Sequence, residues 1–313
     1  MSSPIADLSY RTYTGPIEPS RWRWWTIARM MTALIFHKKI YWVATVISSW
    51  YFLVIMTIVF FVEQVQVSGQ GLDMLNRLVW KDQFYHAFGS GQLLFMLIVL
   101  MAGSGSVAND NQANALVVYL SKPCSRLDYI LGKLIGTFLP IFTAMALPAT
   151  VFFALGLGSY QRYGFFTADP WMFPKVILAL SIVAMLHSTL IVAISSLFRN
   201  GRGAAAVYAA IYFVLTFFAG LMGVLYSGLS QNNPDSPALG NTLPFAYASI
   251  DGISLAVFRQ IVGFANTAPF GAPGTQDLIP TPPVWLTFGA VALVGTLGVL
   301  ILSRRVRAVE VVG

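Results

Sequence analysis

Six long apolar runs constrain this chain more than any other feature of its sequence. They cover approximately residues 40–62, 88–107, 129–155, 173–198, 204–226 and 285–302. Each run is about 20 residues long, which is the length that a helix needs to cross the hydrocarbon core of a bilayer. The runs are continuously apolar instead of alternating, a pattern typical of membrane helices and not of barrel strands. The sequence therefore predicts an all-α integral membrane protein with six transmembrane helices.

The composition supports a membrane protein over a soluble one. Of the 313 residues, 57% are hydrophobic and only 10% are charged, whereas soluble domains carry about 25% charged residues. Successive apolar runs of about 20 residues match the thickness of one membrane. One helical membrane domain is the simplest interpretation.

The positions of the basic residues predict the orientation of the spans. Of the 19 Lys and Arg residues, only Arg77, Lys81, Arg162, Lys175 and Arg259 fall outside the segments expected on the same side as both termini. By the positive-inside rule, both termini are expected in the cytoplasm. The net charge of +7 is then explained by span orientation and by contact with anionic membrane lipid, so no nucleic-acid partner is expected.

Three regions follow from this topology. Residues 1–39 are expected to be a cytoplasmic tail with an amphipathic interfacial helix, residues 40–303 the six-span domain, and residues 304–313 a second cytoplasmic tail. The stretch from Pro19 to Lys39 mixes basic residues with Trp22, Trp24 and Trp25, a composition that suits a helix lying in the headgroup plane. The alternative is a basic flank that only anchors the first span.

The longest connection on the outer face, residues 227–284, is expected to contain a helix that does not span the membrane. Its ends are rich in Pro and Gly, which interrupt helices. Its middle part, residues 245–264, is moderately apolar but contains Asp251 and Arg259. Two charged residues argue against a seventh span, so a partly re-entrant or surface-lying helix is predicted.

Residue types that carry catalysis or bind metals are scarce. His37, His86 and His187 are separated by whole spans, and Cys124 is the single cysteine. The chain has no H-E-x-x-H motif, no paired cysteine ligands and no G-x-S-x-G motif. We therefore expect no metal site, no catalytic residues and no cofactor in this chain.

The fourth and fifth runs offer candidate residues for a substrate path. His187 is an ionisable residue at membrane depth, where it needs a partner or water. The fifth run carries Tyr208, Tyr212, Phe213 and Phe217, which are candidates to line a hydrophobic path or a dimer seam. The alternatives are a neutral histidine bonded to a neighbouring helix, and aromatic residues that serve general helix packing.

Gly132 and Gly136 form a G-x-x-x-G spacing in the third run, and Gly220 and Gly223 lie in the fifth. Small residues allow two helices to approach closely in a membrane. Such spacings are frequent in membrane helices, so they predict packing contacts without identifying the partner helix.

The loop between the second and third runs is expected to form a short cytoplasmic helix. Asn109 or Asp110 can cap the first turn, and Pro123 ends a helix over residues 112–120. Within it, Leu116 and nearby apolar residues form a surface that suits a groove on another protein. The alternative is an ordinary capped loop.

The same loop resembles a known family. The pattern A-L-x-x-Y-L-S-K-P-x-S-R-x-x-Y-x-L-G-K over residues 115–133, preceded by the acidic Asp110, resembles the coupling helix of ABC transporter permeases of the type 2 family. Family members often carry Arg-Glu and then Gly-Thr after the acidic residue, where this chain has Asn111, Gln112, Ala113 and Asn114. This departure implies a less charged contact with the ATPase.

The resemblance implies a permease subunit of an ABC exporter in the bacterial plasma membrane, paired with a separate ABC ATPase and with a second permease copy or paralogue. The coupling helix is expected at about residues 111–122. The residues implied in docking the ATPase are Leu116, Tyr119, Leu120, Lys122 and Arg126. The alternatives are a non-transporting membrane anchor or assembly subunit and, less favoured, a membrane-bound enzyme.

ATP and Mg are expected in the partner ATPase. The phosphate-binding pattern G-x-x-x-x-G-K-S/T is absent, because Gly132-Lys133 is followed by Leu134. The sequence does not specify the cargo, although an apolar and aromatic lining favours a hydrophobic or amphiphilic molecule.

Overall fold

The computed structural model describes residues 22–64, 75, 78–115, 124–231, 248–265, 267, 269–271 and 282–306. Within these residues no β-strand occurs and the regular structure is helical. The α-helices are α1 Arg23–Phe36, α2 Lys39–Ser48, α3 Trp50–Gln64, α5 Trp80–Gly103, α6 Ala108–Gln112, α8 Arg126–Ser159, α9 Met172–Ser196, α10 Gly201–Gln231, α11 Ile250–Val262 and α12 Val284–Arg305. Two short 3₁₀ turns, η1 Gln161–Tyr163 and η4 Pro269–Gly271, complete the described elements.

The prediction of a helical fold with several apolar helices long enough to span a membrane is confirmed. Among the described residues, five helical segments are long and apolar enough to cross a membrane: Trp80–Gln112, Arg126–Ser159, Met172–Ser196, Gly201–Met222 and Val284–Arg305. The pair α2 and α3 adds a sixth if it is counted as one span that bends by 50°. Each of the six apolar runs of the sequence therefore falls on one of these segments.

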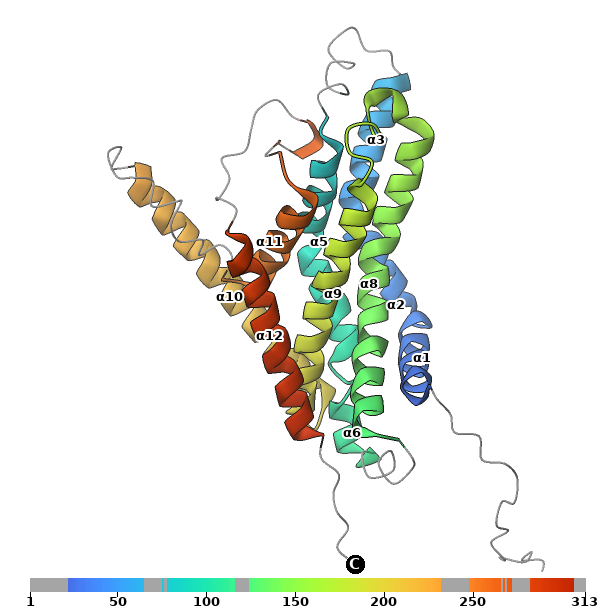
Figure 1. Cartoon of the computed structure of the whole chain (residues 1–313), viewed down its shortest axis with the longest axis vertical. Helices are drawn as coiled ribbons and strands as arrows, with labels where there is room; N and C mark the ends of the chain where they lie inside the picture. The colour runs from blue at the N-terminus through green and yellow to red at the C-terminus, as the bar shows by residue number, and fades with distance from the viewer. Residues whose placement is uncertain are drawn as a thin grey trace, which may run out of the picture.

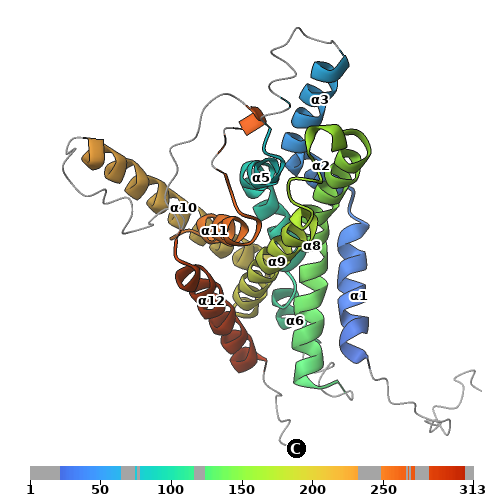
Figure 2. The ribbon, with the colours of Figure 1, turned by 45° about the horizontal axis from the view of Figure 1, so that its top comes forward.

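Helices α5, α8 and α9 form the centre of the bundle, with α1, α2 and α3 on one side and α10 and α12 on the other (Figure 1). Figure 2 shows that α10 diverges from the bundle. The most apolar windows of α5 and α9 are both 61% buried, whereas those of α10 and α12 are 17% and 11% buried. Helices α10 and α12 thus expose most of their apolar surface.

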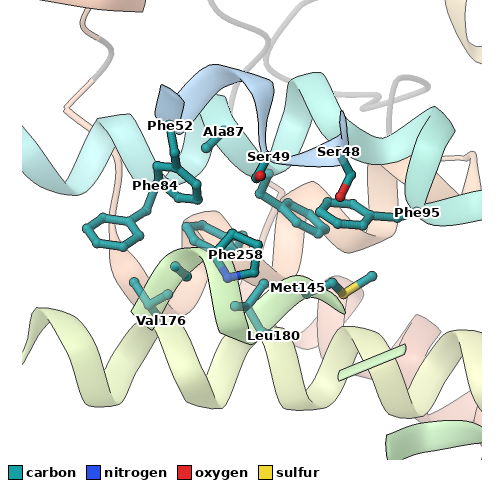
Figure 3. Close-up of a pocket in the computed structure, with 13 residues that line it drawn as sticks. Ser48, Ser49, Phe52, Phe84, Ala87, Phe95, Met145, Val176, Leu180 and Phe258 are labelled. Atoms are coloured by element: carbon teal, nitrogen blue, oxygen red, sulfur yellow. The ribbon is translucent and has the colours of Figure 1, made fainter. Parts of the chain in front are cut away.

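The break between α2 and α3 is packed against small residues and aromatic rings. A Cβ atom on Gly91 of α5 would lie 2.8 Å from the carbonyl oxygen of Ser48, so the close approach requires glycine there. Beside the break, Phe52, Phe88 and Phe258 help to line a cavity of about 20 Å³ (Figure 3). This volume holds about one water molecule.

Helix α1, which covers the stretch expected as an amphipathic interfacial helix, has a packing partner in the bundle. It packs along α8 and follows its axis (Figures 1 and 2). A Cβ atom on Gly132 would lie 2.8 Å from the carbonyl oxygen of Trp24, and one on Gly136 would lie 3.1 Å from Ala28 Cα. The two glycines of this G-x-x-x-G spacing in α8 therefore form the contact surface for α1.

A proline in α8 leaves a backbone carbonyl free for a polar contact with α1. Pro140 of α8 has no N–H group, so it cannot donate to the carbonyl of Gly136 one turn earlier. The hydroxyl of Thr32 in α1 donates to that carbonyl at 3.4 Å, and the Tyr41 hydroxyl donates to the carbonyl of Pro140 at 2.8 Å. Helix α1 is thus held against α8 by close packing at Gly132 and Gly136 and by the hydrogen bond to the Gly136 carbonyl that Pro140 leaves free.

Helix α11 has 13 residues, which span only about 20 Å and cannot cross the hydrocarbon core, as expected for the outer segment. Helix α5 begins at Trp80, before the apolar run at 88–107, and Asp82 in its first turn is fully buried. Its carboxylate accepts hydrogen bonds from the backbone N–H groups of Ala265 and Thr267 at 2.9 and 3.0 Å. This long-range contact extends α5 beyond its apolar run.

The close contact of α1 with Gly132 of α8 yields a stability prediction. Replacing Gly132 with Ala places a methyl group against the backbone of α1, and we expect the free energy of unfolding to fall by about 1–3 kcal/mol. The matched control is Gly158→Ala in the same helix, because a Cβ atom there meets nothing within 4 Å and alanine favours helix. Thermal unfolding of the purified proteins measures the difference, and equal losses for both variants would contradict the packing role.

Candidate functional site

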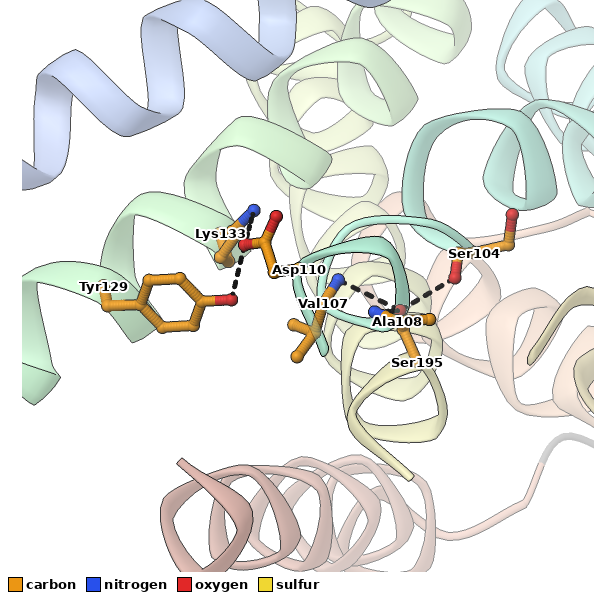
Figure 4. Close-up of polar contacts among 7 residues, drawn as sticks. All are labelled: Ser104, Val107, Ala108, Asp110, Tyr129, Lys133 and Ser195. Carbon is orange, nitrogen blue, oxygen red and sulfur yellow. Dashed lines mark hydrogen bonds and ion pairs between the residues drawn. The ribbon is translucent and has the colours of Figure 1, made fainter. Parts of the chain in front are cut away.

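Helix α6 is capped by a residue from a distant helix. The backbone N–H groups of Val107 and Ala108 donate to Ser195 Oγ of α9 at 3.1 and 3.0 Å. The same hydroxyl donates to the carbonyl of Ser104 at 2.8 Å (Figure 4). The predicted caps, Asn109 and Asp110, lie inside α6 instead. Ser195 thus satisfies free backbone groups on both sides of the turn between α5 and α6.

A buried ion pair joins α6 to α8. Lys133 Nζ lies 2.6 Å from Asp110 Oδ2, and the Tyr129 hydroxyl donates to the same oxygen at 2.7 Å (Figure 4). Lys133 is 5% exposed. Because an unpaired buried charge is strongly destabilising, this carboxylate and this amine hold the two helices in one arrangement.

Two further contacts fix α6 to the segment that follows α9. The side-chain amide of Asn111 donates to the carbonyls of Ser196 and Phe198 at 3.3 and 3.1 Å. A Cβ atom on Gly201, the first residue of α10, would lie 3.1 Å from Gly105 Cα. We call the contacts of α6 with α8, α9 and the start of α10 the α6 junction.

Of the docking residues expected from the resemblance, the structure describes one. Arg126 is the first residue of α8 and is exposed, whereas Leu116, Tyr119, Leu120 and Lys122 fall outside the described residues. Helix α6 ends at Gln112, and Asn114 adopts a positive φ of 50°. A continuous helix over residues 111–122 is therefore wrong at its N-terminal end, where the chain turns after α6.

The start of α8 carries a capping box that sequence reasoning missed. Ser125 Oγ accepts from the Asp128 N–H group at 3.1 Å, and Asp128 Oδ2 accepts from the Ser125 N–H group at 3.1 Å. The S-x-x-D spacing at residues 125–128 could have identified this cap. It ends the loop after Pro123 and begins α8 at a defined residue.

Cys124 borders the same loop and is partly buried. Burial raises the pKa of its thiol, the nearby Asp128 carboxylate raises it further, and Arg23 opposes both effects. A raised pKa keeps the thiol protonated at neutral pH, so this cysteine is a poor nucleophile.

The residues proposed for a substrate path separate into two groups. His187 Nδ1 lies 2.7 Å from the Tyr208 hydroxyl, and both residues are buried. Tyr212 is also buried and interacts with Asp251 of α11. Phe213 and Phe217 are 51% and 73% exposed, so they lie outside the buried group, although the Phe213 ring contacts the Tyr212 ring at a centroid distance of 5.7 Å.

Sequence reasoning missed the α11 members of this polar group. Ser254 Oγ lies 3.4 Å from His187 Nε2, and the Thr216 hydroxyl donates to Asp251 Oδ2 at 3.3 Å. Gln92 of α5 donates its side-chain amide to the Asp251 carbonyl at 3.3 Å. The placement of Asp251 in an outer loop concealed its partners in α5 and α10, because only the fold brings α11 between these helices.

The molecule is a helical membrane protein whose α6 junction connects a loop to several spans, and whose described residues hold no group of three or more potential metal ligands. The chain belongs to the ABC-2 family of transporter proteins, whose model matches residues 25–266. Members of this family are membrane components of transporters and are not themselves catalytic enzymes. No curated protein matches the chain.

The ion pair of the α6 junction yields a second stability prediction. Asp110→Ala leaves Lys133 buried without its counter-charge, and we expect a loss of about 3 kcal/mol in the free energy of unfolding. The double variant Asp110→Leu with Lys133→Leu should recover much of that loss. Urea or thermal unfolding of the purified variants provides the measurement.

The control for this prediction is the more exposed pair of Lys175 and Asp169, whose side chains are 40% and 22% exposed. Asp169→Asn should cost at most about 1 kcal/mol, because solvent screens this pair. If Asp110→Ala proved as mild as Asp169→Asn, the junction would not depend on the ion pair.

Proposed function

We propose that this chain is the permease subunit of an ABC exporter and that a separate ATPase subunit drives it by pressing on the loop between α6 and α8. The observation that carries the proposal is the α6 junction. In a family of transporter proteins, one polar segment is bonded at once to α8 through Asp110 and to α9 through Ser195 and Asn111.

Through the α6 junction, a displacement of this loop can be transmitted to the spans. Packed helices move as rigid bodies, because their interfaces resist continuous deformation. A displacement of α6 carries Asp110 with it, and the buried Lys133 must follow or lose its counter-charge. Movement of the loop is therefore expected to shift α8 and α9 together and to open or close the path between spans.

The proposed roles of the two partners are distinct. Leu116, Tyr119, Leu120, Lys122 and Arg126 dock the ATPase, and the partner supplies ATP and Mg. In such an ATPase a phosphate-binding loop and its metal stabilise the transferred phosphoryl group. This chain contributes the contact surface and the membrane path.

In the proposed membrane orientation, the end of the bundle that carries α6 faces the cytoplasm of a bacterial cell. The start of α1, helix α6 and the end of α12 lie at the same end of the bundle (Figure 1). Arg304 and Arg305 end α12 there, in accord with the positive-inside rule. The proposed location is the plasma membrane.

A second permease copy or a paralogue is proposed to complete the transporter. Helices α10 and α12 expose most of their apolar residues, including Phe217 and Trp285 at 73% and 74%. The buried group of His187, Tyr208 and Tyr212 lies between α9 and α10. A hydrophobic or amphiphilic cargo suits an apolar path with a few hydrogen-bonding groups.

The docking proposal is tested with the full-length chain and its ATPase. Leu116→Asp or Tyr119→Asp places a charge in the apolar contact, and we expect copurification of the ATPase to fall by at least about tenfold, equal to 1.4 kcal/mol. Phe166→Asp is the control, because Phe166 is exposed in the loop after α8, at the opposite end of that helix. An ATPase that stays bound to both docking variants would refute the assignment.

Cys124 tests the orientation without any substitution. A membrane-impermeant maleimide should label it in inside-out vesicles and not in right-side-out cells. Labelling should be slow at neutral pH and accelerate as the pH rises, because burial raises the thiol pKa and the thiolate is the reactive form.

The matched control is Cys124→Ser, which should abolish labelling in both preparations. Labelling of intact right-side-out cells at the same rate as inside-out vesicles would reverse the proposed topology.

A further inference from the structure

A groove of about 360 Å³ lies between α1, the turn that joins α5 to α6, and α8. Its apolar lining includes Met30, Met31 and Leu34 of α1. Its polar lining includes Lys38, Ser106 and Lys133. The groove is separate from the group around His187 and Tyr208, and it shares Asp110 and Lys133 with the α6 junction.

The polar atoms of this groove are not all satisfied by the protein. Ser106 is 6% exposed, and its Oγ has no hydrogen-bond partner among the described residues. A buried hydroxyl without a partner costs free energy, so a ligand atom at this position would be stabilised. The groove therefore contains a hydrogen-bonding group that is available to a bound molecule.

The charge of the lining favours an anion. Lys133 is paired with Asp110, but Lys38 is exposed and forms no ion pair within the part of the chain that the structure describes. These two lysines and one aspartate leave one net positive charge. A phosphate group meets this requirement with both charge and hydrogen-bond acceptors.

The apolar lining continues onto an exposed surface. Met30 and Leu34 are 62% and 57% exposed, so they form a wall that reaches from the groove to the outside of α1. A small soluble anion would make no use of that wall. An amphiphile would bury its chain there while its headgroup occupies the polar part.

We propose that this groove is a binding site for an anionic membrane phospholipid, with the headgroup phosphate near Lys38 and Ser106 and the acyl chain along Met30 and Leu34. The site adjoins the α6 junction through Asp110 and Lys133, but binding of the lipid itself requires neither the ATPase nor the cargo. Binding of the lipid would hold α1 against the α6 junction.

The test uses the full-length chain reconstituted with photoactivatable phosphatidylglycerol in phosphatidylcholine vesicles. We expect crosslinks in peptides of α1 and of the turn between α5 and α6. Lys38→Gln should lower the crosslink yield about fivefold, because one lysine near anionic lipid contributes about 1 kcal/mol. Met30→Glu, which adds a negative charge to the apolar wall, should lower the yield at least as much.

The matched control is Lys39→Gln, since Lys39 is the exposed neighbour that does not line the groove. It should leave the yield unchanged. Equal losses for Lys38→Gln and Lys39→Gln would reduce the effect to general surface charge and overturn the site.

Two competitors identify the source of the phosphate. Excess unlabelled phosphatidylglycerol should displace the probe, whereas inorganic phosphate should not. Displacement by inorganic phosphate alone, or equal labelling by photoactivatable phosphatidylcholine, would overturn the proposal of an anionic lipid. Circular dichroism of each variant verifies that the fold is retained, and none of these readouts depends on ATP hydrolysis.

Discussion

The buried pair of Asp110 and Lys133 is the interaction on which the α6 end of the bundle depends. A lysine that is 5% exposed must have a counter-charge, and the nearest carboxylate belongs to a different helix at 2.6 Å. Tyr129 adds a hydrogen bond to that carboxylate. Because the cost of separating the pair is high, α6 and α8 are expected to move together.

Helix α8 combines this role with the attachment of α1. Gly132 and Lys133 are neighbours in sequence, yet the glycine receives α1 and the lysine reaches α6. One short stretch of α8 therefore joins the N-terminal helix and the α6 junction. The groove between α1 and the turn after α5 is a consequence of this arrangement, because two elements packed on adjacent faces of α8 leave space between them.

The polar residues within the bundle follow the same physical rule. His187, Tyr208 and Ser254 bond to one another across three helices, and Asp82 accepts backbone N–H groups from the segment after α11. Each of these polar groups lies where another element satisfies it, since an unsatisfied group in an apolar environment is costly. These contacts position α11 against α5, α9 and α10 although it is too short to span a membrane.

The sequence by itself determined the class of fold and the positions of the membrane helices, because the lengths of the apolar runs at 129–155 and 173–198 are local properties of the chain. It also indicated the family through the residues around Asp110 and the loop at 115–133. Only the tertiary structure decided that Gly132 seats α1, that Ser195 caps α6 and that Asp251 meets Thr216. Hydropathy reports how a residue partitions between water and lipid, whereas these contacts depend on which distant helix lies opposite, and that is fixed only when the bundle packs.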